Sequence, residues 1–180
     1  METISTIELR KSTRGFKDMQ IPDVALDAIL HAGKEAPVAM GAFQSMHVTI
    51  LQDTELIRKI SEVTSGTNST GADIFYNAPT LIIVSSMQQP TEGFAYCNAG
   101  CICENMLLAA TDLGMGSVFI FGMVEAFEKD PTLLHLCEIP DGFYPVSSIA
   151  IGYATDEAMA IPKQQRTITF NVVSCTNYVI

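Results

Sequence analysis

Hydrophobic positions along the chain recur with two spacings, one typical of helices and one typical of strands. A helix is expected between Pro22 and Gly33, with an inner face made of Leu26, Ile29 and Leu30. Residues 5–8 (Ser-Thr-Ile-Glu) have the form of a capping box, which predicts a short helix that opens at Ser5. The N-terminal part of the chain is therefore expected to be helical.

Three further helices follow from the same spacing. One is capped by Asp53 or Thr54 and buries Leu56, Ile57, Ile60 and Val63. The longest spans residues 97–113, ends at Gly114, and has an inner face of Ile102, Met106, Ala109, Ala110 and Leu113. A short one is capped by Asp130–Pro131, and the polar stretch 64–71 predicts an exposed loop.

Strands are expected where β-branched and aromatic residues gather, over 46–52, 79–86, 117–121, 146–152 and, in the tail, 166–173. The second of these is almost continuously apolar, as in a central strand. Helices and strands alternate without a strict βαβ rhythm. The predicted fold is therefore α+β, a mixed central β-sheet wrapped by helices, in one domain over 1–180. The dinucleotide-binding pattern Gly-x-Gly-x-x-Gly does not follow the first strand, which disfavours a Rossmann domain.

Composition adds an expectation about assembly. Of the 180 residues, 48% are hydrophobic and only 17% are charged, so apolar surface must line either a ligand cavity or a subunit interface. We favour the interface, because a small protein with nine Met residues has to cover that surface somewhere.

Charge and targeting signals narrow the class of partner. The net charge of −10 argues against nucleic acid and against an anionic membrane surface. Neither a signal peptide nor an apolar stretch of membrane-spanning length is visible. The five cysteines, an odd number, are read as reduced thiols, so a cytoplasmic location is expected.

The sharpest chemical feature is a basic segment, Arg10-Lys11-Ser12-Thr13-Arg14, with Lys17 close behind. Four of the ten Lys and Arg residues lie within these eight positions. Guanidinium groups bind phosphate through paired hydrogen bonds and hydroxyls add more, so Arg10, Lys11, Ser12 and Arg14 are candidate anion ligands. The alternative is a solvated basic face.

Five segments of the chain, taken in order, form a recognisable combination. The first is Arg-x-Ser-x-Arg after an N-terminal helix, and the others are Ala36–Gly41 with Gln44, Phe75–Pro79, Cys103–Ala110 with Leu113–Ser117, and Ile139–Gly142 before Ile151–Tyr153. In their order and spacing they resemble the FMN-dependent nitroreductase family, in which the first segment is similar to the FMN-phosphate motif. Departures from the family pattern are one extra residue between Pro37 and Gln44, Ser45-Met46 in place of Pro-Trp, and no Lys before Phe75.

The resemblance implies bound FMN, NADH or NADPH as electron donor, and a homodimer with shared flavin sites. It implies that Pro37, Val38, Ala39, Met40 and Gln44 reach the flavin of the partner subunit. It also implies that Ile120, Phe121 and Gly122 face the reactive edge of the ring, where a bare glycine backbone permits close approach. Lys163 and Arg166 are the expected C-terminal phosphate contacts, with solvated tail cations as the alternative.

Side chains with chemistry of their own are few. Cys97, Cys101 and Cys103 lack zinc-site spacing and are expected to be buried, inert thiols, and the three histidines show no metal pattern. We therefore name no catalytic or metal-ligating residue. The predicted function is hydride transfer from NAD(P)H through FMN to a small acceptor such as a nitroaromatic or quinone. Alternatives are a flavin-binding or sensing protein without turnover, another flavin reaction on the same fold, and thiol redox at Cys97 and Cys101.

Overall fold

A computed structural model of the chain describes residues 2–65, 73–87, 93–165 and 167–173. The order of the elements within them is α1 (Thr3–Leu9), α2 (Asp23–Lys34), η1 (Ala39–Gly41), η2 (Phe43–Ser45), β1 (Met46–Leu51), α3 (Thr54–Ser65), β2 (Thr80–Ser86), α4 (Phe94–Asp112), β3 (Gly116–Ile120), α5 (Val124–Lys129), α6 (Thr132–Leu136), β4 (Tyr144–Gly152) and α7 (Asp156–Ala160).

The four strands form one sheet in the order β1-β2-β4-β3, with every neighbouring pair antiparallel. The α+β class is confirmed, but among the described strands the sheet is antiparallel rather than mixed. A helix between two strands does not decide their relative direction. The connection that contains the helix can bring the chain back to the end of the sheet where the first strand finished, and the second strand then runs antiparallel to the first. The parallel contact found in the described residues is an isolated bridge between Ser12 and Ser117.

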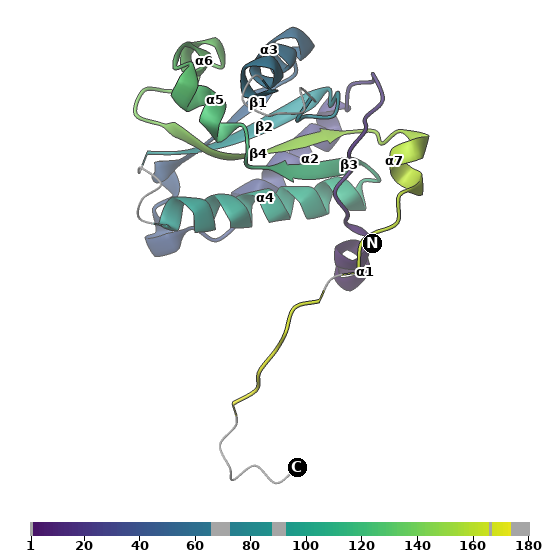
Figure 1. Ribbon diagram of the computed structural model, residues 1–180. Helices are drawn as coiled ribbons and strands as arrows, with labels where there is room; N and C mark the ends of the chain where they lie inside the picture. Colours follow the sequence, from purple (N-terminus) through teal and green to yellow (C-terminus); the bar gives the residue numbers. More distant parts are fainter. Residues whose placement is uncertain (1, 66–72, 88–92, 166, 174–180) are drawn as a thin grey trace, which may run out of the picture.

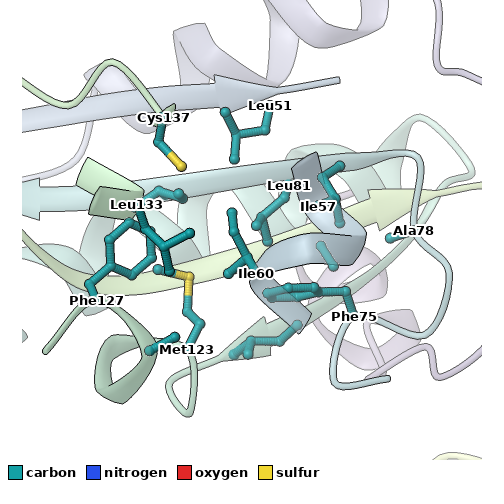
Figure 2. Packing of buried hydrophobic residues seen from close by; sticks show 14 of the residues in the cluster. Leu51, Ile57, Ile60, Phe75, Ala78, Leu81, Met123, Phe127, Leu133 and Cys137 are labelled. Carbon is teal, nitrogen blue, oxygen red and sulfur yellow. The ribbon is translucent and has the colours of Figure 1, made fainter. Parts of the chain in front are cut away.

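Helices cover both faces of the sheet. Figure 1 shows α2 and α4 on one face and α3, α5 and α6 on the other. β2 is buried along its whole length, as predicted for a central strand. One apolar cluster lies under each helical layer, and Figure 2 shows the cluster beneath α3, α5 and α6, which includes the fully buried Ile60, Phe75, Leu81 and Leu133. The core thus has two halves divided by the sheet.

The predicted helices exist, with shifted ends. α1 begins at Thr3, so Ser5 lies inside it and the predicted capping box is wrong. α2 continues past Gly33, which is buried; a Cβ there would lie 2.9 Å from Met106 Cγ, so this glycine permits close packing on α4 rather than ending the helix. The caps at Asp53 and Asp130 are confirmed: each carboxylate accepts a hydrogen bond from a backbone N–H of the next turn.

The tail departs from the prediction. Residues 167–173 form no strand, and all seven are exposed as the chain runs away from the body (Figure 1). A strand needs a neighbour for its backbone hydrogen bonds, and no described part of the chain pairs with the tail. The short helices α5 and α7 were not predicted from the sequence. Most of the predicted loop 64–71 lies outside the described residues, and no helix within the described ranges is long and apolar enough to cross a membrane.

Candidate functional site

The basic segment is held as an extended strap across two strand ends. Thr13 N donates to Ser117 O (2.9 Å) at the start of β3, and Lys17 N donates to Tyr153 O (2.8 Å) just after β4. Between them, the Phe16 side chain is buried in the core. We call residues 10–17 the strap; its backbone is fixed to the sheet at Thr13 and Lys17.

An extended backbone points successive side chains to opposite sides, and this divides the basic segment in two. Arg10, Ser12 and Arg14 share one side. Lys11 and Thr13 share the other, where Thr13 is buried and lies so close to β3 that a Cβ at Gly116 would come within 2.8 Å of it. The strap therefore presents three of the four predicted anion ligands together.

Lys11 has other partners. Its Nζ lies 3.2 Å from Ala158 O, 2.7 Å from Met159 O and 2.6 Å from Ile161 O, at the end of α7. A lysine ammonium has three N–H donors, so these carbonyls occupy all of them. The role that this geometry gives Lys11 is to tie the strap to the C-terminal segment.

Lys163 also connects the C-terminal segment to the N-terminal part of the chain. Its Nζ donates to Ile7 O (2.8 Å) and Glu8 O (2.6 Å), near the C-terminus of α1. Lys17 forms an ion pair with Asp156 at 3.0 Å. These contacts fix where the C-terminal segment leaves the body. The other predicted C-terminal phosphate contact, Arg166, lies outside the described residues.

The two arginines of the strap side differ in environment. The Arg10 side chain is only 12% exposed, and its Nε lies 3.0 Å from Glu104 Oε1 on α4. Arg14 is exposed and has no ion pair or hydrogen bond to its side chain among the described residues. Ser12 is half-buried between them. Together they can bind a small dianion through charge-assisted hydrogen bonds.

The end of β3 lies along the same edge of the molecule. Ser12 is paired with Ser117, and Phe121 lies four residues further, about 13 Å at the rise of an extended strand. Ile120 is buried, so only its backbone is available, and its carbonyl accepts from Ser148 Oγ at 3.0 Å. A Cβ at Gly122 would meet nothing within 4 Å, so its backbone is open.

Two exposed aromatic residues near the predicted Phe121 were not predicted, Tyr96 and Phe119. Phe121 is 51% exposed and contacts Tyr96 of α4, with ring centroids 5.8 Å apart. Phe119 is exposed as well and, unlike its core-facing neighbours Val118 and Ile120, faces the α4 side of the sheet. The period of two in β3 could have identified Phe119. Tyr96 carried no sequence signal, because it lies before the predicted start of the helix.

The loop 37–44 lies elsewhere. Its backbone is anchored by Ala39 N, which donates to the buried Asn98 Oδ1 at 2.9 Å. Met40 has a left-handed backbone (φ 58°) and is 94% exposed, while Pro37 and Gln44 are also exposed and Val38 is half-buried. Asn98, a polar residue on the inner face of α4, is a positioning residue that the sequence analysis missed.

Helix α4 separates this loop from the end of β3. Tyr96, which contacts Phe121, and Asn98, which holds the loop, are two residues apart and so about 200° apart around the helix axis. No hydrogen bond joins the loop to the strap or to residues 120–122 within the described ranges. One chain therefore brings the strap and the end of β3 together but leaves the loop on another side.

The cysteines fall into two groups. Burial raises the pKa of Cys103 from 9.0 to about 11 and that of Cys137 to about 11, as expected for inert thiols. Cys97 and Cys101 are exposed, so their predicted burial is wrong. They lie at i and i+4 on the face of α4 that no other element of the described chain covers. In the described part of the chain, no three His, Cys, Asp or Glu residues are placed to hold a metal ion.

The sequence matches the family model described as the Nitroreductase family over residues 7–72 and 67–153. It is 33% identical over 161 residues to a protein of Archaeoglobus fulgidus named, provisionally, NADH dehydrogenase/NAD(P)H nitroreductase, and the match covers 87% of each chain. It is 27% identical to an FMN reductase [NAD(P)H] of Bacillus subtilis, with 90% of this chain and 70% of the relative covered.

A similar structure extends the likeness to three dimensions. A nitroreductase from Bacteroides fragilis, solved with bound FMN, superposes with a TM-score of 0.84 at 30% sequence identity. The superposition covers 97% of this chain and all of the other.

Proposed function

Because this chain belongs to the nitroreductase family, we propose that it is an FMN-dependent oxidoreductase that uses NADH or NADPH to reduce a small acceptor. The observation that carries this proposal is the alignment of two features along one edge. The strap offers a phosphate site at the start of β3, and exposed aromatic residues with open glycine backbone lie at its end. The ribityl chain of FMN joins a phosphate to a flat ring across a distance of this order.

The donor set suits the phosphate of FMN. Arg10, Ser12 and Arg14 lie on one side of the strap and supply charged and hydroxyl donors. Lys11 is left out of the proposed phosphate site, because its ammonium is engaged with carbonyls. Lys163 binds the end of α1, and Arg166 remains a proposed phosphate contact.

The far end of β3 suits the ring. The backbone at Ile120 and Gly122 and the side chain of Phe121 would contact it, and bare backbone at Gly122 lets a flat group approach closely. When bound, FMN supplies the hydride chemistry between the nicotinamide and an acceptor such as a nitroaromatic or quinone. The chain itself has only to bind and orient these molecules.

We further propose a homodimer with two shared sites. The loop 37–44 and the end of β3 lie on different sides of α4, so a flavin contacted by both needs the loop of the partner subunit. Met40 is suited to this role, since its left-handed backbone directs a nearly fully exposed side chain outward. The exposed face of α4, which carries Cys97, Gly100 and Cys101, would lie in the interface.

The tail supports the same assembly. Ile168, Phe170 and Val172 alternate with polar residues, and each is exposed in the single chain. β1 is an edge strand whose outer side has no partner among the described residues. We propose that the tail of one subunit pairs with β1 of the other as an added strand. The backbone groups of the tail and of the outer side of β1 would then have hydrogen-bond partners. The whole chain would then act as a single domain in the cytoplasm.

The visible spectrum of the purified protein with its released chromophore tests the proposal. We expect FMN absorption that is bleached by NADH or NADPH without oxygen and restored by a quinone or nitroarene. A protein that binds FMN but is not reduced would be a flavin-binding protein without turnover. A colourless protein that does not take up FMN would contradict the assignment.

A further inference from the structure

An acidic side chain lies directly against the proposed phosphate site. Glu104, halfway along α4, places Oε1 3.0 Å from Arg10 Nε. A carboxylate near a bound phosphate would repel it, so its presence there needs a physical reason. The physical reason lies in the atom that Glu104 contacts, which is Nε of the Arg10 guanidinium.

The guanidinium of Arg10 has five N–H donors, one on Nε and two on each Nη. Glu104 engages the Nε side, so the Nη groups remain available for a second acceptor. Because the guanidinium is planar and rigid, holding one side fixes the direction of the others. The backbone of Arg10 is also fixed, since its N–H donates to Thr6 O at the end of α1 and the rest of the strap follows.

Because the Arg10 side chain is mostly buried, it needs Glu104 as a charged partner as well as for its orientation. The Arg10 side chain is 12% exposed, whereas that of Glu104 is 48% exposed. A guanidinium that is mostly removed from water is costly without a charged partner. Glu104 provides that partner in the absence of an anion, so Arg10 does not have to turn toward solvent.

We propose that Glu104 is a positioning residue for cofactor binding: it holds the Arg10 guanidinium through Nε and so directs the Nη groups at the cofactor phosphate beside Ser12 and Arg14. This inference rests on the proposed function. It assigns a role to a residue that does not itself contact the cofactor.

The test compares FMN with riboflavin, which lacks the phosphate. Glu104→Ala is expected to weaken FMN binding roughly tenfold, because Arg10 loses its orientation, and to leave riboflavin binding unchanged. Glu104→Gln keeps an oxygen that can accept from Nε, so its FMN affinity is expected within about threefold of the wild-type value. Dissociation constants are read from quenching of flavin fluorescence.

A double-mutant cycle shows whether the effect acts through Arg10. In an Arg10→Ala background, Glu104→Ala is expected to cause no further loss of FMN affinity. Glu62→Ala, which removes another Glu–Arg pair, on α3, is the matched control and is expected to change neither flavin's affinity.

Three outcomes would overturn the inference: FMN affinity that is unchanged or higher in Glu104→Ala, an equal loss for riboflavin, or a loss that persists without Arg10. Wild-type protein that binds no FMN would instead overturn the proposed function itself.

Discussion

At the scale of single residues, the two arginines on one side of the strap differ: Arg10 forms an ion pair with Glu104, and Arg14 forms none among the described residues. Arg14 is exposed and makes no ion pair within the described ranges, so a bound phosphate would be its first charged partner. Arg10, by contrast, reaches the site already oriented by Glu104. The two guanidinium groups therefore contribute differently to binding.

We expect Arg14→Ala to weaken FMN binding by about 1.5–3 kcal/mol, the usual value of a hydrogen bond to a charged group. The fold should be unaffected, because the side chain is exposed. Titration of the apoprotein with FMN measures the loss. Arg58→Ala, which removes an arginine from α3, is the control. Equal affinity of both variants and the wild type would show that Arg14 belongs to a solvated face and not to a phosphate site.

Lys11 is expected to act on stability more than on cofactor binding. Its three carbonyl contacts join the strap to the end of α7. Lys11→Ala should lower the free energy of unfolding by about 1–2 kcal/mol, because these carbonyls lose a cationic donor. Urea unfolding monitored by circular dichroism measures this. An unchanged unfolding midpoint combined with a large loss of FMN affinity would return Lys11 to the phosphate site.

Cys103 predicts a dependence of stability on alkaline pH. Burial raises the pKa of its thiol from 9.0 to about 11, with a partly opposing contact to Ser147 at 3.3 Å. The unfolded chain loses this proton first, so the contribution to stability is complete below about pH 9 and is lost as the pH approaches 11.

The measurement is the free energy of unfolding at about pH 8 and about pH 10, in wild type and Cys103→Ala. The fall between the two values should be smaller in the variant, which cannot ionise there. Identical falls would show that Cys103 does not contribute.

At the scale of elements, α4 organises the candidate site. Tyr96 contacts Phe121 at the ring end, Asn98 holds the loop on another side, and Glu104 holds Arg10 at the phosphate end. These three contacts come from a stretch of nine residues of one helix, and their directions follow from its rotation per residue. A rigid helix thus sets the spacing of segments that lie far apart in the sequence.

The contact between strap and β3 depends on Gly116. A Cβ there would lie 2.8 Å from both Oγ1 and Cγ2 of Thr13, which is buried and cannot move aside. Gly116→Ala should destabilise the protein by about 1–3 kcal/mol and weaken FMN binding, because Ser12 and Arg14 flank Thr13.

Adding Thr13→Ala removes both close atoms and should restore part of the stability lost in Gly116→Ala. Thermal unfolding and FMN titration of the single and double variants measure both effects. A Gly116→Ala protein with wild-type stability would show that the strap moves freely relative to β3.

At the scale of the whole molecule, the tail is a described segment that its own chain leaves exposed, and in the proposed dimer the second subunit buries it. Residues 167–173 are exposed and point away from the body (Figure 1). If the proposed dimer shares its flavin sites, removal of residues 161–180 should weaken the dimer and FMN binding together, because part of the interface and part of the site are lost at once. Analytical ultracentrifugation with flavin absorbance detection follows both.

The matched control is Ile4→Ser, a change at another exposed apolar residue outside the proposed shared site. We expect it to retain FMN and the mass of a dimer. A full-length protein that sediments as a 19.5 kDa monomer and keeps its FMN would contradict the shared-site proposal.

Local features of the fold could be predicted from the sequence because they depend on neighbours along the chain. The strand at 79–86 follows from its apolar run, and the caps at Asp53 and Asp130 follow from a carboxylate placed just before a helical turn. The basic segment could be identified as a candidate anion site for the same reason. Its resemblance to a family then supplied the cofactor.

What only the tertiary structure decided depends on contacts between distant segments. The antiparallel direction of neighbouring strands depends on the end of the sheet to which each connection returns the chain. The separation of Lys11 from Arg10, Ser12 and Arg14 follows from the pairing of the strap with β3, and the orientation of Arg10 depends on a glutamate ninety-four positions later. Periodicity within one segment cannot encode these features, because a side chain's partner is set by the packing of the whole chain.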